Sequence, residues 1–234
     1  MRSNEGDQIR VLDHGSVKFI EAWGADYRII EAARMSTDKG FVDWEHDAKL
    51  LSFLYRNKHM TPFEIGGMVL EIKAPIFVFR EWHRHRTQSY NEMSARYIPL
   101  PNENYLPDAE NAVARSEKAA AATNRQAAGT GKILTLAVAL TDLVNLLNTY
   151  DQCQAQYDQM LDHGWPKELA RLPVPVARYS RMRASANLRN WLQFMELRMA
   201  AGAQQEIRLF ANAVAKFVEL QFPKTFALFS ENSK

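Results

Sequence analysis

The stretch Val69–Arg86, VLEIKAPIFVFREWHRHR, contains two local patterns separated by one proline. In VLEIKA, residues 69–74, apolar and charged side chains alternate, which predicts a β-strand with one face in water. Pro75 breaks the alternation and suits the first position of a helix. We therefore expect a helix to begin at PIFVFREWHRH and to deliver the His/Arg cluster at or near its end, with TQSYNEMSA, residues 87–95, as a loop.

The chain before this stretch predicts one strand and two helices. VKFIEAW, residues 17–23, has strand composition, and YRIIEAARMS, residues 27–36, follows as a short helix. DWEHDAKLLSFLYRNKH, residues 43–59, is a second helix with acids in its first turn, ended by Thr61 and Pro62. Its predicted stripe at helical spacing is Trp44, Ala48, Leu51 and Tyr55.

The chain after the cluster is rich in helical patterns. Residues 101–132 are polar and alanine-rich and are interpreted as a mobile or partly helical excursion. A helix is predicted from residue 133 to Gly164, and the three prolines of residues 166–180 are interpreted as a crossing between helices. A last long helix, residues 205–222, carries a predicted core stripe of Ile207, Phe210, Val214 and Phe217.

Composition indicates an ordinary globular protein. The 234 residues are 47% hydrophobic and 24% charged, and we expect one domain spanning 1–234. No apolar run is long enough to cross a bilayer, and the first ten residues lack the hydrophobic stretch of a secretory signal, so we predict a cytoplasmic protein with no membrane partner. The single cysteine, Cys153, excludes an internal disulfide and, with no local group to stabilise a thiolate, is interpreted as structural.

Positive charge is local although the net charge is only +2. One group of arginines lies around the predicted helix end and a second lies in the C-terminal third: Arg80, Arg84, Arg86 and Arg96, then Arg171, Arg178, Arg181, Arg183, Arg189 and Arg198. This distribution argues against an extended polyanion-binding surface, and we expect no nucleic-acid partner.

The segment WHRHRTQSYNEMSARY, residues 82–97, is the strongest candidate for chemistry. A metal site at His83 and His85 is disfavoured because the flanking arginines repel divalent cations, so no metal is expected. Arginines among aromatic residues also suit nucleic acid. A small phosphate-bearing ligand fits better, since arginine forks pair with phosphate and Glu92 can accept from a ribose hydroxyl or a ring N–H. From composition alone, a solvated arginine-rich loop with surface ion pairs remains an equal alternative.

The same residues resemble a known family. Arg84, His85 and Arg86, followed after seven residues by Ser94, reproduce the signature of the flavin-dependent thymidylate synthases. The segments AARMS, KHMTPFE, KAPIFVFREW, ANLRNWLQFMELR and AQQEIR are also similar to that family's segments, in the same order. The resemblance covers most of the chain except roughly residues 105–150.

The resemblance implies a fold and a reaction. It implies a mixed α/β (α+β) domain with a central antiparallel sheet flanked by helices, a helix-rich C-terminal half, and a homotetramer with sites between subunits. It implies methyl transfer to dUMP from methylenetetrahydrofolate, with NADPH reducing bound FAD, and no cysteine nucleophile. A related hydroxymethylase acting on a pyrimidine nucleotide is the alternative.

The resemblance also implies site residues, carried over position by position. The expected catalytic group is Arg198, placed against the uracil ring. The expected FAD-binding residues are His59, Thr61, Arg84, His85, Arg86, Glu92, Asn187, Leu188, Arg189 and Gln193. The expected dUMP-binding residues are Glu81, Arg84, Glu92, Met93, Ser94, Ala95, Arg96, Arg171 and Arg198.

Two positions depart from the family's pattern. Glu81 stands where some relatives have glutamine, and this extra carboxylate weakens anion binding unless it pairs with an arginine; Gln193 replaces an asparagine. Arg189 and Gln193 are four apart and share a helix face, whereas Arg198 lies nine beyond Arg189 and faces the opposite side of an unbroken helix. Either that helix breaks, or these residues serve different pockets.

Overall fold

The computed structural model describes residues 7–121 and 132–232, and these contain a five-stranded sheet. The strands are β1 Gln8–Val11, β2 Gly15–Trp23, β3 Gly67–Pro75, β4 Ser89–Glu92 and β5 Tyr179–Asn187, and their order across the sheet is β1-β2-β3-β5-β4. β1 with β2, β2 with β3, and β4 with β5 pair antiparallel. The expected antiparallel sheet is therefore confirmed.

Helices make up most of the remaining described chain. They are α1 Asp26–Arg34, α2 Trp44–Arg56, α3 Ile76–Trp82, α4 Ala109–Ala121, α5 Leu136–Asp162, α6 Lys167–Ala170, α7 Leu188–Arg198, α8 Gln205–Gln221 and α9 Pro223–Asn232, with short 3-10 turns η1 Met35–Thr37 and η2 Thr61–Glu64. The predicted helices at 27–36, 43–59, 75–85, 133–164 and 205–222 all exist, with ends displaced by a few residues.

The chain forms two compact units, each of which is described by itself. The first comprises residues 1–74, 78–93 and 181–234, and the second comprises residues 75–77 and 94–180. Most of the sheet and helices α1, α2, α7, α8 and α9 belong to the first unit, whereas α4, α5 and α6 belong to the second.

Two predicted loops contain strands instead. Residues 87–95 were expected to be a loop, but Ser89–Glu92 form β4, which pairs with β5 from Ser89 opposite Ser185 to Glu92 opposite Met182. The proline-rich crossing after Gly164 leads into β5 and not into a helix. In β5 the buried Met182, Ala184 and Ala186 alternate with more exposed residues, including two arginines, which is a strand pattern that the arginine content obscured.

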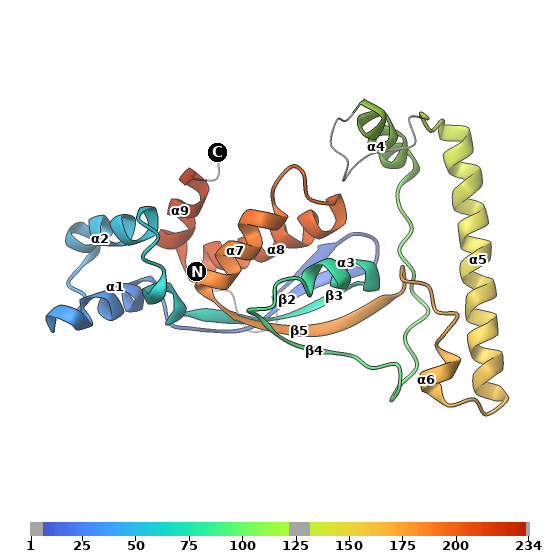
Figure 1. Ribbon diagram of the computed structural model, residues 1–234, viewed down its shortest axis with the longest axis horizontal. Coiled ribbons are helices and arrows are strands. Elements are labelled where there is room, and N and C mark those ends of the chain that lie inside the picture. The colour runs from blue at the N-terminus through green and yellow to red at the C-terminus, as the bar shows by residue number, and fades with distance from the viewer. Residues whose placement is uncertain (1–6, 122–131, 233–234) are drawn as a thin grey trace. The chain divides into compact units, whose positions relative to one another are not determined.

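The core of the first unit lies between the sheet and the helices α7 and α8, which Figure 1 shows along one face of the strands. Alternate residues of β3, from Met68 to Ala74, are fully buried. The predicted stripe of α8 is also fully or almost fully buried, and the rings of Phe19 and Phe217 lie 5.9 Å apart. Each such side chain contributes roughly 1.5–3 kcal/mol when it is buried away from water, so this layer fixes α8 against the sheet, and α7 packs against α8.

Helix α2 buries a different stripe from the one predicted. Leu51 and Tyr55 are buried, but Ala48 is exposed and Asp47 takes the inward position. The Asp47 carboxylate accepts hydrogen bonds from the Arg34 guanidinium and from the backbone N–H of Val42, 2.9 Å away. Burial of a carboxylate is tolerated when it is paired and hydrogen-bonded, so this ion pair ties α2 to the end of α1.

A second buried carboxylate links the first helix to the last. Asp26, only 4% exposed, accepts hydrogen bonds from Lys224 N at 2.8 Å, Thr225 N at 3.1 Å and Thr225 Oγ1 at 2.7 Å. These backbone groups lie in the first turn of α9 and have no partner within that helix. Desolvation raises the pKa of Asp26, and the three hydrogen bonds lower it by less.

In the second unit, α5 is a helix of 27 residues against which α4 and α6 pack. Its inward side carries the buried Ala139, Tyr150 and Tyr157. Another stripe of α5 is apolar yet exposed: Leu136, Leu140, Val144 and Leu147 are 44%, 52%, 57% and 45% exposed. The predicted excursion is helical over 109–121, and its residues 122–131 lie outside the described residues.

Candidate active site

The His/Arg cluster lies in a turn directly after α3, as the sequence predicted. Two aromatic residues hold this turn. The single O–H of Tyr90 lies within hydrogen-bond distance of two carbonyls, that of His85 at 2.7 Å and that of Trp82 at 3.1 Å, which share its proton. The buried indole of Trp82 donates to Gln88 Oε1 at 3.1 Å, closing the turn from the other side. The expected ligand-binding cations Arg84 and Arg86 are consequently exposed on a fixed backbone.

Arg198, at the end of α7, reaches the same turn. Its Nε donates to His85 Nε2 at 2.9 Å, its Nη1 donates to Glu81 Oε2 at 2.9 Å, and its Nη2 donates to the Glu81 carbonyl at 3.0 Å. Residues more than 110 positions apart in the sequence are thus joined by three hydrogen bonds. The carboxylate of Glu81, which departs from the family's pattern, does pair with an arginine.

The surroundings of this group alter two acid–base equilibria. Burial, and then the charge of Arg198, lower the pKa of His85 to about 4, so its ring is neutral at pH 7. Desolvation raises the pKa of Glu81, while Arg198 lowers it and the nearby carboxylate of Glu206 raises it. Phe194 lies against the His85 ring at 4.9 Å between centroids and supplies part of this apolar environment.

Helix α7 is unbroken from Leu188 to Arg198. Of the two alternatives drawn from the sequence, a broken helix is therefore excluded, and the one that remains is that Arg189 and Arg198 serve different pockets. At the start of α7, Arg189 forms an ion pair with Glu64 of η2. Gln193 lies one turn further along and is exposed, as Arg189 is. The Arg189 side chain therefore pairs with η2, whereas the Arg198 side chain bonds to the turn after α3.

Two expected cofactor residues at the start of α7 have structural roles. The Asn187 side chain accepts from Asn190 N at 3.0 Å and caps the helix. The side chain of Leu188 is fully buried, and its N–H donates to the Gly66 carbonyl at 2.7 Å. The side chain and the N–H of Leu188 therefore both have structural partners. Asn190, which the sequence did not single out, donates to the Thr87 carbonyl at 3.1 Å and joins α7 to the arginine-rich turn.

The remaining expected cofactor residues of the first unit lie near η2 and on β4. His59 and Thr61 are exposed just before and at the start of η2, which packs against α7. Glu92 is the last residue of β4, and Met93 follows it with its N–H donated to the Arg181 carbonyl at 2.7 Å. These residues share one unit with Arg84, His85 and Arg198.

The other expected nucleotide residues belong to the second unit. Ser94 Oγ accepts from both the backbone N–H and the Nε of Arg96, each at 3.3 Å, and Ala95 between them is buried. Lys167 of α6 donates to the Tyr97 carbonyl at 2.8 Å, so the helix that precedes the exposed Arg171 is tied to this loop. Within this unit, Arg96 and Arg171 thus supply two exposed cations on connected segments.

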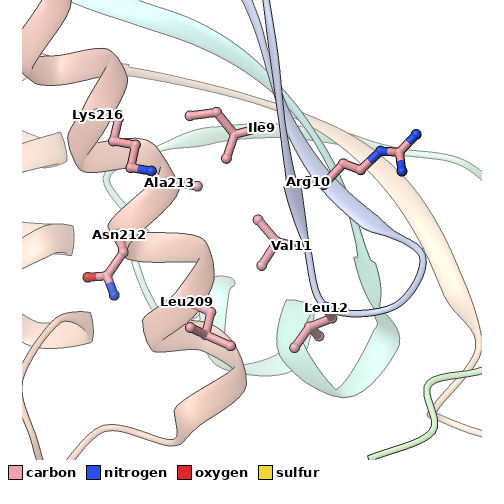
Figure 2. Close-up of a pocket in the computed structure, with 8 residues that line it drawn as sticks. All are labelled: Ile9, Arg10, Val11, Leu12, Leu209, Asn212, Ala213 and Lys216. Atoms are coloured by element: carbon pink, nitrogen blue, oxygen red, sulfur yellow. The ribbon is translucent and has the colours of Figure 1, made fainter.

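The surface hollow in Figure 2 does not include these residues. It has a volume of about 250 Å³ and is lined by Ile9, Val11 and Leu12 of the β1 hairpin and by Leu209 and Ala213 of α8. Within residues 7–121 and 132–232, no three His, Cys, Asp or Glu side chains cluster in a way that could hold a metal ion. No helix in the same ranges combines the length and the apolar character needed to cross a membrane.

Comparison with known proteins identifies the family of the chain. The model of the family described as thymidylate synthase complementing protein matches residues 18–224. Proteins named flavin-dependent thymidylate synthase are 37% identical in Anaplasma marginale, over 96% of this chain and 75% of the relative, and 36% identical in Thermus thermophilus, over 96% and 78%. A UMP/dUMP methylase, PolB from Streptomyces cacaoi, solved with 5-Br dUMP, has a TM-score of 0.82 and 29% identity over 95% of this chain and 97% of that one.

These matches extend over nearly the whole chain, across both units and through the turn that holds Arg84, His85 and Arg86. The resemblance found from the sequence motifs is confirmed, and the chain belongs to the thymidylate synthase complementing protein family.

Proposed function

We propose that the chain is a flavin-dependent thymidylate synthase of the cytoplasm, which converts dUMP to dTMP with FAD, NADPH and methylenetetrahydrofolate. The observation that carries this proposal is the contact of Arg198 with the turn of Arg84, His85 and Arg86, in a chain similar to flavin-dependent thymidylate synthases over 96% of its length. A guanidinium beside a turn rich in cations suits a nucleotide that combines a polar base with an anionic phosphate.

The residues of the first unit fit a dinucleotide flavin. Arg84 and Arg86 present exposed guanidinium groups, and a pyrophosphate is an anion that such groups bind through paired hydrogen bonds. Arg189, also exposed, would contribute from its ion pair with Glu64. His59, Thr61, Glu92, Asn187, Gln193 and the Leu188 carbonyl would complete the contacts. When bound, the flavin supplies the reducing equivalents of the reaction. The protein's share is to bind, to orient and to place charge.

The expected nucleotide residues have two chemical roles. Arg96 and Arg171 are the cations for its phosphate, with Ser94 as a hydroxyl donor and with Glu92, Met93 and Ala95 on the connecting segment. Arg198 would donate to a carbonyl of the uracil ring and stabilise negative charge that develops there during attack at C5. Cys153 lies in α5, half-buried, and takes no part in this scheme.

We propose further that the protein is a homotetramer with sites between subunits. The support in this chain is the exposed apolar stripe of α5, because a continuous row of four large apolar side chains in water favours association. Light scattering during gel filtration measures the assembly, and Leu140→Glu with Val144→Glu should lower the molecular mass. A wild-type monomer at micromolar concentration would contradict the tetramer.

The first experiment is an absorbance spectrum of the purified protein with added FAD. Anaerobic NADPH is then added with and without dUMP. Bleaching of the bound flavin that is faster with dUMP supports the proposal, and the absence of flavin binding overturns it. Mass spectrometry of the product after methylenetetrahydrofolate addition separates methylation from the alternative hydroxymethylation, and a parallel assay with UMP tests the choice of sugar.

Arg198→Ala tests the assigned catalytic group. Its removal should leave FAD binding within about threefold, since Arg198 is expected against the uracil ring and its hydrogen bonds are to Glu81 and His85. It should lower turnover by about 10²–10³-fold, as loss of an electrostatic donor typically does. The matched control is Arg208→Ala, which removes a half-buried arginine that donates to the Ala201 carbonyl. Wild-type-like turnover of Arg198→Ala would remove this residue from the mechanism.

A further inference from the structure

We propose that Glu81 and His85 are positioning residues for Arg198, which fix its guanidinium plane and leave a defined pair of N–H bonds for a neutral carbonyl acceptor of the ligand. The three hydrogen bonds from Arg198 use its Nε–H, one N–H of Nη1 and one of Nη2. A guanidinium has five N–H donors. At most two are therefore available to a ligand, one on Nη1 and one on Nη2.

The opposite charges of Arg198 and Glu81 decide which ligand atoms Arg198 can bind well. The Arg198 and Glu81 side chains are 19% and 27% exposed, and at 2.9 Å their opposite charges largely compensate each other. A compensated guanidinium attracts a phosphate weakly, whereas its hydrogen bonds to a polar carbonyl remain directional. The group therefore suits the carbonyl edge of a pyrimidine and is a poor phosphate site, unlike the exposed Arg96 and Arg171.

The geometry also fixes the tautomer of His85. The Nε of arginine always carries a hydrogen and has no acceptor capacity, so His85 Nε2 must accept and must be unprotonated. A neutral imidazole with a bare Nε2 carries its proton on Nδ1. In the proposed arrangement this Nδ1–H would donate to a ligand next to the arginine-rich turn. The lowered pKa of His85 keeps the ring in this form at pH 7.

The kinetic part of the test rests on the proposed function and uses Glu81→Ala, Glu81→Gln, Arg198→Ala and the double variant Glu81→Ala/Arg198→Ala in the FAD-loaded protein. Loss of the Glu81 side chain should lower kcat by about 10–100-fold through misorientation of Arg198, with FAD affinity unchanged. Glu81→Gln retains an acceptor oxygen and should recover most of that loss. The control is Glu31→Gln, which breaks the ion pair with Arg28 elsewhere in the same unit.

The double variant separates positioning from a general structural effect. If Glu81 acts through Arg198, adding Glu81→Ala to Arg198→Ala should lower kcat by less than about a further twofold. The reason is that the effects of substitutions at two interacting residues are not additive. An equal loss from Glu81→Ala with and without Arg198 would overturn the proposal. So would a Glu81→Gln variant that is as impaired as Glu81→Ala.

A second arm needs no turnover. In ¹⁵N-labelled protein, with the His85 signals assigned by their loss in His85→Gln, Nε2 should be unprotonated and Nδ1 protonated at pH 7. A protonated Nε2 would overturn the inferred arrangement. If the tautomer is as expected but the protein binds no flavin and forms no dTMP, the proposed function fails while the geometry of the three residues stands.

Discussion

Removal of the Asp26 carboxylate should destabilise the first unit by an amount that its contacts allow us to estimate. In Asp26→Ala, the N–H groups of Lys224 and Thr225 and the Thr225 hydroxyl all lose their acceptor, and Thr225 is fully buried. Each unsatisfied buried polar group costs about 1–3 kcal/mol. Part of this cost is offset because the variant no longer buries a carboxylate, and the desolvation penalty of that carboxylate, which raises the pKa of Asp26, is removed. We expect a net loss of about 2–4 kcal/mol in the free energy of unfolding.

Asp26→Asn should cost less than the alanine variant. An amide oxygen in the place of Oδ1 still accepts from Thr225 N and Thr225 Oγ1, and only the Lys224 N–H then faces an NH₂ group. A loss of about 1–2 kcal/mol follows from one hydrogen bond exchanged for a donor–donor contact.

The assay is urea unfolding followed by circular dichroism at fixed protein concentration, with thermal unfolding in parallel. For a chain of this length, each kcal/mol corresponds to about 2–4 °C in Tm, so the alanine variant should melt roughly 8 °C lower. The control Asp43→Asn alters an exposed N-cap of α2 and should have a smaller effect. A loss below about 1 kcal/mol for Asp26→Ala, or an asparagine variant as unstable as the alanine variant, would refute the reasoning.

Three further predictions concern His85, Trp82 and Cys153. The pKa of His85 is lowered from 6.5 to about 4, so as the pH falls the unfolded chain binds a proton at this residue before the folded chain does. The free energy of unfolding should therefore decrease by about 1–2 kcal/mol between pH 7 and pH 5 through this group. In His85→Gln, the urea midpoint should depend less on pH than in the wild type. Trp82→Ala should cost about 3–5 kcal/mol because the indole is fully buried and bonded to Gln88; chemical denaturation measures this, and a loss below 2 kcal/mol would contradict it. Cys153→Ala should retain dTMP formation within about twofold, and a hundredfold loss in a folded variant would show that the thiol participates.

Elements with a strong local pattern could be predicted from the sequence. The alternation in β3 and the stripe of α8 need only burial on one side, and both are present where expected. Strand β4 could not be predicted because its four polar residues, SYNE, become a strand through pairing with β5, almost 90 positions later. In α2, the inward position of Asp47 depends on Arg34, and helical spacing of apolar residues contains no information about such a partner.

The candidate site divides in the same way. The signature around Arg84 to Ser94 identified the segment, and the family it indicated is confirmed. The partners of Arg198 could not be predicted, because hydrogen bonds to Glu81 and His85 join residues 117 and 113 positions apart. Likewise, nothing in the sequence marks Tyr90 as the residue that anchors the turn or Asn190 as its link to α7; only the folded contacts reveal them.

The unbroken helix α7 has a consequence for how this chain can tolerate insertions and deletions. Arg189 and Arg198 are nine residues apart, which corresponds to about 13–14 Å along the axis and a half-turn around it. One residue inserted between them would rotate Arg198 by about 100° away from Glu81 and His85. One residue inserted in the connection from Met199 to Gln204 would leave the relative orientation of Arg189 and Arg198 unchanged. Length variation among functional variants should therefore be accepted in that connection and rejected between Arg189 and Arg198.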